Sequence, residues 1–318
     1  MRAYIIRRLL LFIPTLFILS AIVFLTVRFI PGDAIDAMVA SSDYLALDLD
    51  RETLLKQLGL DVPMYVQYLN WMRGMLLEGT FGDSLMGAWS VEERILERLP
   101  VTIQLGVTAI VIGMLIALPV GIYSAVRQDT FSDYIARTIA VLGLATPNFW
   151  LATLVMIFPA LWWGWSPPLE MVPFTEDPLA SLYGTLIPSL ILGTGMAAGT
   201  MRLTRTMMLE VLRQDYIRTA WSKGLRGRVV ILRHATKNAL IPVVTGIGLQ
   251  LPLLVGGSVI IENIFNLPGL GQLALEALLD RDYPVVSGVN LFFGMAVLII
   301  NLIIDLIYPY LDPRVRYR

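Results

Sequence analysis

The residue types that perform covalent chemistry are scarce in this sequence, which has one histidine, His234, and no cysteine. Histidine-based metal clusters, thiolate metal sites and disulfides are therefore excluded, and a Ser–His–Asp set has no support. No Gly-x-x-x-x-Gly-Lys-Ser/Thr phosphate loop occurs, and residues 224–227 are too short to cradle phosphates. We interpret His234 as part of a packed loop. The chain is predicted to be no enzyme and to use no cofactor or metal.

Polar side chains inside long apolar runs are a second kind of candidate, because such residues often mark a solute path through a membrane. Asn148, Gln250 and Asn290 are the candidate translocation-path residues. Asn148 also has a plainer interpretation, since it follows Pro147 and would satisfy the backbone of a broken helix. Asp305, an acid in the last apolar run, is interpreted as lying near the inner membrane surface beside a cation.

The third feature is a basic segment, 213–246, between two apolar runs. Its apolar residues at 216, 217, 220 and 221 recur at helical spacing, which predicts one stripe of a short amphipathic helix. Gly224 suits the residue that ends such a helix, and an apolar helix resumes at Val229–Leu232. The cations fit either an anchor on anionic lipid or a helix that docks into a protein groove. The polar face opposite the stripe favours the groove.

Composition places these residues in an integral membrane protein with all-α architecture. Apolar residues make up 56% of the chain and charged residues 15%, whereas soluble domains carry about 25% charge. Net charge is −1, so no global basic field indicates nucleic acid binding. Six runs are long enough to cross a bilayer: Leu9–Ile30, Val101–Val126, Ile139–Trp163, Thr185–Leu203, Leu240–Ile261 and Val285–Ile307. The first run is too long for a cleaved signal peptide and is expected to stay as an anchor.

The distribution of cations agrees with six spans. The N-terminus, the turn with Arg127 and Arg137, the basic segment and the C-terminus all fall on one side, which places both termini in the cytoplasm. Residues 31–100 then form an extracytoplasmic helical insertion. Its expected helices, with N-caps at Asp50 and Thr53, cover Arg51–Leu58, Tyr65–Leu77 and Val91–Leu99. The last of these is expected to lie along the membrane before Pro100.

The order of these segments resembles the inner-membrane permease subunits of ABC importers, in the peptide/nickel/opine branch. Arg218-Thr219-Ala220 stands where that family has Glu-Ala-Ala, and Gly224 keeps the family spacing. The proline expected near Lys237 comes instead at Pro242, as is typical of the branch. Further similar stretches lie at 4–10, 28–33, 81–84, 147–150, 262–271 and 308–314.

The resemblance implies a type I ABC importer permease fold and a role as half of the translocation pathway for peptides or similar small solutes. It implies a bacterial or archaeal inner-membrane location. The implied partners are a homologous second permease, two ATP-binding subunits and an extracytoplasmic solute-binding protein. The alternative is a stand-alone secondary transporter or channel. The solute itself is not predicted. The implied ATPase-coupling helix comprises Tyr216, Ile217, Arg218, Thr219, Ala220, Trp221, Lys223, Gly224 and Leu225.

The expected domain organisation follows from these segments. Residues 1–30 form the first transmembrane helix and 31–100 the insertion. Residues 101–308 form the core permease domain, with five transmembrane helices and a cytoplasmic coupling loop at 204–237. Residues 309–318 form a cytoplasmic tail.

Overall fold

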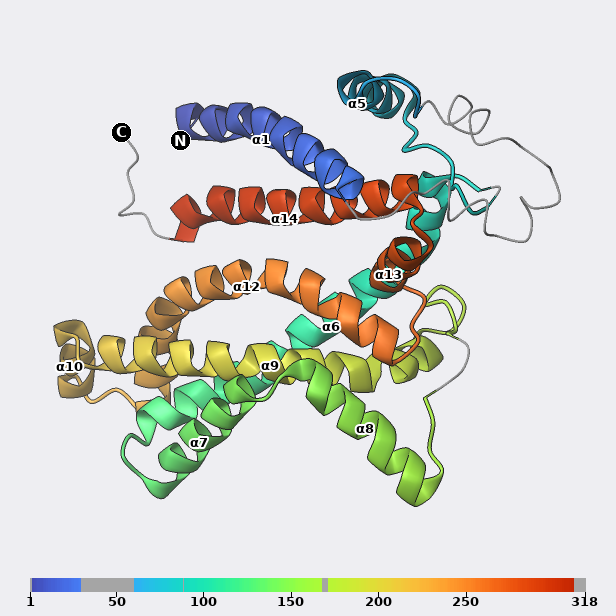
Figure 1. The fold of residues 1–318 in the computed structure, drawn as a ribbon. Helices are drawn as coiled ribbons and strands as arrows, with labels where there is room; N and C mark the ends of the chain where they lie inside the picture. The colour runs from blue at the N-terminus through green and yellow to red at the C-terminus, as the bar shows by residue number, and fades with distance from the viewer. Residues whose placement is uncertain (1, 30–59, 88, 168–170, 312–318) are drawn as a thin grey trace. The chain divides into compact units, whose positions relative to one another are not determined.

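The computed structural model describes residues 2–29, 60–87, 89–167 and 171–311 (Figure 1). Within these ranges the regular elements are helices, and Asp83 and Ser90 form an isolated β-bridge. The helices are α1 (Arg2–Arg28), α5 (Met64–Arg73), η1 (Gly74–Glu78), α6 (Val91–Val126), α7 (Phe131–Ala145), α8 (Asn148–Trp163), α9 (Pro178–Leu212), α10 (Asp215–Ser222), α11 (Gly227–Val229), η2 (Val230–Thr236), α12 (Lys237–Ile264), α13 (Leu270–Asp280) and α14 (Tyr283–Leu311). The two elements labelled η are π-helical.

Several of these helices are long and apolar enough to cross a membrane. Four helices in the described part meet this requirement by themselves: Ile5–Arg28, Val91–Val126, Pro178–Leu212 and Tyr283–Leu306. Two bent pairs pass the same criteria, Phe131–Ala145 with Asn148–Trp163 at 92° and Gly227–Pro252 with Leu254–Ile264 at 49°. Counting each bent pair as one span gives six, the number predicted from the sequence. The predicted all-α class is confirmed.

The run predicted as one span at Ile139–Trp163 is broken, so that prediction was wrong in its detail. Thr146 has an extended backbone (φ −92°, ψ 117°), and α8 restarts after Pro147. A proline disfavours helical dihedrals in the residue before it, which accounts for the break. The first helix of the pair begins at Phe131, upstream of the predicted start.

The helices predicted within residues 31–100 also differ from expectation in one place. The helix predicted over Val91–Leu99 is not separate, because α6 continues through Pro100 to Val126. Proline removes one helical hydrogen bond, a loss that long membrane helices tolerate. Residues 65–77, predicted helical, lie in α5 and η1. The helix predicted at 51–58 and its caps lie outside the described residues.

The chain divides into two compact units, and each is described by itself. The first contains Ile103–Leu267 and the segment from Ile299, and the second contains the segment up to Thr102 together with Pro268–Leu298. The domain boundaries expected from the sequence stay a prediction.

In the first unit α7, α8 and α12 pack against α9 (Figure 1). Glycines let α6 approach α9 closely. A Cβ built on Gly193 would lie 2.7 Å from the carbonyl oxygen of Ala109, and one on Gly121 would lie 2.8 Å from that of Met201. Small residues at such crossings allow backbone-to-backbone packing between membrane helices. A further contact cluster of small side chains joins three helices: Ala117 of α6, Ala140 of α7, and Ala197 and Met201 of α9.

The second unit has its own apolar core. Its buried residues are Val27, Val91, Ile95, Leu270, Leu273, Ala277, Val285, Val286 and Val289. A buried carboxylate, Asp282, lies just before α14. It accepts hydrogen bonds from the Ser84 hydroxyl and from the Leu85 N–H at 3.2 Å. These contacts fix the loop that precedes α6.

Candidate functional site

The segment with the most distinctive local structure is α10, which lies across the end of α9 (Figure 1). Gln214 is extended and precedes the helix, and Asp215 places a negative charge in the first turn, where the helix dipole favours it. The helix ends because Gly224 adopts a left-handed conformation (φ 71°) and donates its N–H to the carbonyl of Trp221 at 2.9 Å. The sequence predicted this terminating glycine correctly.

One face of α10 is buried. Ile217 is fully buried and Ala220 is 7% exposed. Both pack in one apolar cluster with Ala125 of α6, Met208 of α9, Val230 and Ala235 of η2, and Ala239 of α12. The predicted apolar stripe is therefore half correct: its two inner members attach α10 to four other helical elements.

The other two members of the stripe are largely exposed. Tyr216 is 44% and Trp221 49% exposed. They share the accessible surface with Arg218, Thr219, Ser222, Lys223 and Leu225. Half-exposed aromatic side chains next to cations are characteristic of protein contact surfaces, since they supply large apolar area at low entropy cost. Arg218 forms an ion pair at 3.3 Å with the exposed Asp215, so the face that α10 presents carries both signs of charge beside the two aromatic rings.

A polar contact joins α10 to the start of α12. Asn238 donates from Nδ2 to the Tyr216 hydroxyl at 3.0 Å and to the carbonyl oxygen of His234 at 3.0 Å. The apolar helix expected at Val229–Leu232 begins as α11 and continues as η2, directly into α12. Thr236 donates its hydroxyl proton to the carbonyl of Ile231 at 3.0 Å, five residues back, across the wide π-helical turn. No break therefore separates this segment from the membrane helix.

The candidate path residues occupy two different places. Asn148 lies at the break between α7 and α8, with its amide against Gly195, where an added Cβ would lie 2.5 Å from Oδ1. Gln250 of α12 donates to the Thr200 hydroxyl at 3.2 Å. Both amides thus contact neighbouring turns of α9. Asn290 belongs to the second unit, and its Nδ2 donates to the carbonyl oxygen of Val286 at 2.9 Å in the same helix.

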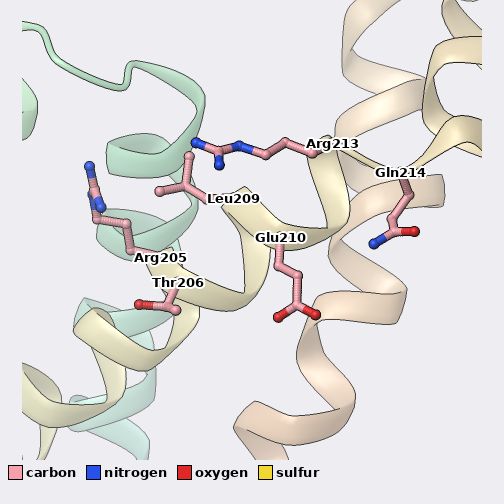
Figure 2. Close-up of a pocket in the computed structure, with 6 residues that line it drawn as sticks. All are labelled: Arg205, Thr206, Leu209, Glu210, Arg213 and Gln214. Atoms are coloured by element: carbon pink, nitrogen blue, oxygen red, sulfur yellow. The ribbon is translucent and has the colours of Figure 1, made fainter.

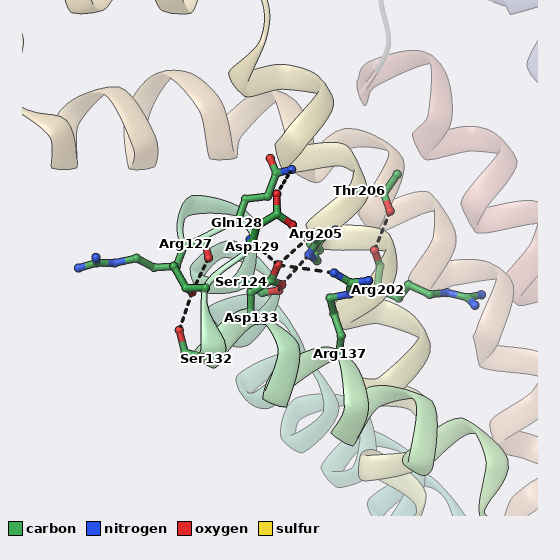
Figure 3. Close-up of polar contacts among 11 residues, drawn as sticks. Ser124, Arg127, Gln128, Asp129, Ser132, Asp133, Arg137, Arg202, Arg205 and Thr206 are labelled. Carbon is green, nitrogen blue, oxygen red and sulfur yellow. Dashed lines mark hydrogen bonds and ion pairs between the residues drawn. The ribbon is translucent and has the colours of Figure 1, made fainter.

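The sequence reasoning missed a buried ion pair near the end of α9 (Figure 3). Asp133, in the first turn of α7, is fully buried. Arg205 donates to both of its oxygens, from Nε at 2.8 Å and from Nη2 at 2.8 Å. Ser124 of α6 donates its hydroxyl proton to the same carboxylate, and the Asp129 N–H donates at 3.0 Å. One acid therefore receives donors from α6, from the turn after it and from α9.

A surface groove follows the last turns of α9 (Figure 2). Its volume is about 490 Å³ and its lining comes entirely from one helix and the residues just after it: Arg205, Thr206, Leu209, Glu210, Arg213 and Gln214. The Arg205 guanidinium turns away to the ion pair. Among the residues that the structure describes, no group of three acidic, histidine or cysteine side chains could hold a metal ion.

Comparison with solved structures finds a similar fold. A chain of a crystal structure described as an amino acid ABC transporter with histidines superposes with a TM-score of 0.51, covering 69% of this chain and 94% of that one. The two chains share 13% sequence identity, so the likeness concerns the fold alone. This chain therefore shares its fold with a chain of that transporter structure.

Sequence comparison gives the family. A family model described as "Binding-protein-dependent transport system inner membrane component" matches residues 117–317, and the corresponding N-terminal model matches residues 1–106. The chain belongs to this family of importer permease subunits, which confirms the resemblance drawn from the sequence.

Curated relatives match over the full length. The oligopeptide transport system permease AppB of Bacillus subtilis (strain 168) is 38% identical over all of both chains. A putative peptide transport system permease of Brucella abortus (strain 2308) is 40% identical, again over all of both. The glutathione transport system permease GsiC of Escherichia coli O1:K1 / APEC is 37% identical over 99% of each chain.

Proposed function

We propose that this chain forms half of the translocation pathway of an ATP-driven importer that carries peptides or similar small solutes inward. The relatives that support this are described as permeases for oligopeptides, peptides and glutathione, which share peptide chemistry. Their full-length similarity supports the same role for this chain. The solute is selected largely by an external binding protein, so the permease alone leaves its identity open.

The observation that carries the proposed mechanism is the two-sided burial of α10. Ile217 and Ala220 pack α10 against neighbouring helices of its own unit, whereas Trp221, Arg218 and Lys223 are exposed. A helix attached on one face and free on the other suits a docking element. We assign α10 to the ATPase-coupling helix, with Trp221 as the apolar anchor and Arg218 and Lys223 as charged contacts.

The proposed assembly contains this chain, a homologous permease, two ATP-binding subunits and an extracytoplasmic binding protein. Nucleotide-driven closure of the ATPases would displace α10 and shift the pore between two states. Nucleotide and solute would each favour the state to which they bind more tightly. Asn148 of α8 and Gln250 of α12, which contact neighbouring turns of α9, are proposed to face the solute path. Asn290 stays a candidate path residue on the sequence pattern alone.

A charge reversal tests the docking role. In the reconstituted importer, Lys223→Glu is expected to lower solute-stimulated ATP hydrolysis and transport together by about tenfold, equivalent to about 1.4 kcal/mol of coupling. Arg127→Glu is the matched control, because Arg127 is an exposed cation of the turn between α6 and α7. It should leave both activities close to the wild-type values.

The control separates docking from a purely lipid-anchoring role. If the cations serve only to bind anionic lipid, the two reversals should have similar effects, and these effects should vanish in neutral vesicles. Equal losses of transport in both variants would contradict the docking assignment. So would wild-type transport and wild-type solute-stimulated ATP hydrolysis in Lys223→Glu.

A further inference from the structure

The buried carboxylate of Asp133 lies next to the attachment of α10. Ser124, its hydroxyl donor, precedes Ala125, and Arg205 lies one helical turn before Met208. Ala125 and Met208 belong to the apolar cluster that holds Ile217 of α10. The ion pair and the cluster that holds α10 are therefore connected through adjacent residues of α6 and through one turn of α9.

The geometry of the Asp133–Arg205 ion pair favours a contact that persists during transport. Asp133 is fully buried, and its guanidinium partner Arg205 makes two parallel hydrogen bonds of 2.8 Å. Separating the two groups would leave an uncompensated charge away from water, which is strongly unfavourable. Ser124 and the Asp129 N–H supply further donors, and Arg137 of α7 lies 3.9 Å from the same carboxylate as a second, weaker ion-pair partner.

The packing beyond the ion pair agrees with a rigid contact. Gly121 brings the α6 backbone against Met201 of α9, and Ala140 of α7 packs with Ala197 of α9. Gly143 of α7 lies beside Ala198 of α9, where an added Cβ would be 3.2 Å from that of the alanine. Close-packed interfaces of this kind move as units and do not deform continuously.

We infer that Asp133 and Arg205 are positioning residues of the coupling apparatus, which join α6, α7 and α9 into one body that moves with α10. This inference rests on the proposed docking role of α10. The bent junction between α7 and α8, at Thr146 and Pro147, then lies at the border of that body. A displacement of α10 would reach α8 and its Asn148 through α7.

A disulfide across the proposed rigid contact provides the first test. The chain has no native cysteine, so Gly143→Cys with Ala198→Cys introduces one defined pair. The Cβ atoms at positions 143 and 198 would be 3.2 Å apart. This distance has to increase by only a few tenths of an ångström to reach the disulfide range of about 3.5–4.5 Å. After oxidation of the reconstituted importer, transport should stay within about twofold of the single-cysteine variants. Loss of transport on oxidation, regained with reductant, would overturn the inference.

Substitution of the pair provides the second test. Asp133→Asn and Arg205→Lys should raise the ATP hydrolysed per solute transported by severalfold, because α7 no longer follows α9. The matched controls are Glu176→Gln, an exposed acid on the segment before α9, and Arg202→Lys, an exposed cation one turn earlier on α9. Both controls should keep the wild-type ratio. An unchanged ratio in the variants of the pair would overturn the inference.

A rescue distinguishes positioning from general destabilisation. In the Asp133→Asn background, oxidation of the cysteine pair at 143 and 198 should restore the wild-type ratio, and reductant should abolish it again. Failure of this rescue, with disulfide formation verified, would count against a positioning role. The oxidised pair alone tests the contact even if Asp133→Asn fails to fold. The inference and the docking proposal fail separately, because Lys223→Glu leaves the contact between α7 and α9 intact.

Discussion

At the residue scale, burial of carboxylates distinguishes this chain from a plain bundle of apolar helices. Asp133 is neutralised by an arginine, whereas Asp282 is held by a hydroxyl and by backbone N–H groups. Burial raises the pKa of Asp282, and its hydrogen bonds from Ser84 and the Leu85 N–H oppose that rise only in part. This carboxyl binds its proton more tightly in the folded unit than in the unfolded chain.

The raised pKa of Asp282 predicts a pH dependence of stability. Because the folded state binds more protons, stability should fall as pH rises from the ordinary aspartate value of about 3.9 through the folded pKa, and then level off. The advantage of wild type over Asp282→Asn in apparent melting temperature should therefore be largest at the acidic end. Asp83→Asn, an exposed acid in the loop that Asp282 contacts, should keep the wild-type profile. An advantage that grows with pH would contradict this assignment.

The sequence could not predict the roles of these acids. Asp133 lies in a turn whose cations Arg127 and Arg137 indicated only membrane orientation. Its arginine partner lies 72 residues further along the chain, and only the packing of α7 on α9 brings the two together. A local pattern carries no information on such a contact. Gly224 was predictable because its left-handed backbone depends on its own helix end.

At the element scale, helix existence was easier to predict than helix continuity. Apolar periodicity located every predicted span on a helical stretch or bent pair. It did not distinguish Pro100, through which α6 continues, from Pro147, where the chain bends by 92°. Both prolines disfavour helical dihedrals in the residue before them, so this local rule does not separate the two cases.

The crossing of α6 and α9 gives a prediction at this scale. Gly193→Ala should destabilise the purified protein by about 1–3 kcal/mol, because the new methyl would meet the carbonyl oxygen of Ala109 at 2.7 Å. Gly106→Ala in α6 is the control, since nothing lies within 4 Å of its Cβ position. It should be neutral or slightly stabilising. Melting temperatures in detergent that drop equally for both variants would argue against a close backbone crossing.

At the scale of the whole molecule, the described helices provide up to six spans, the number with which the distribution of cations is consistent. The sequence alone gave this level of description well, because hydropathy and charge act over long stretches. The side of the membrane on which α10 lies stays a prediction, and it rests on the short cation-rich segments.

The absence of native cysteine makes that orientation directly measurable. Ser222→Cys lies on α10 and Thr175→Cys on the segment between α8 and α9, and both positions are exposed. In intact cells a membrane-impermeant thiol reagent should label the cysteine at 175 and spare that at 222. Permeabilised cells should label both. The reverse pattern in intact cells would show that the topology is opposite to the predicted one, and it would contradict the docking proposal.

The π-helical turns of η2 have a consequence for rotational register. A wide turn holds more residues than an α-helical turn, in which each residue advances by about 100°. The side chains of α12 are therefore rotated relative to those of α11 by an amount that a uniform α-helix would not give. This rotation sets the direction in which Asn238 meets Tyr216. Deleting a single residue between Val230 and Thr236 would turn α10 onto a different side of α12 while leaving both helices intact.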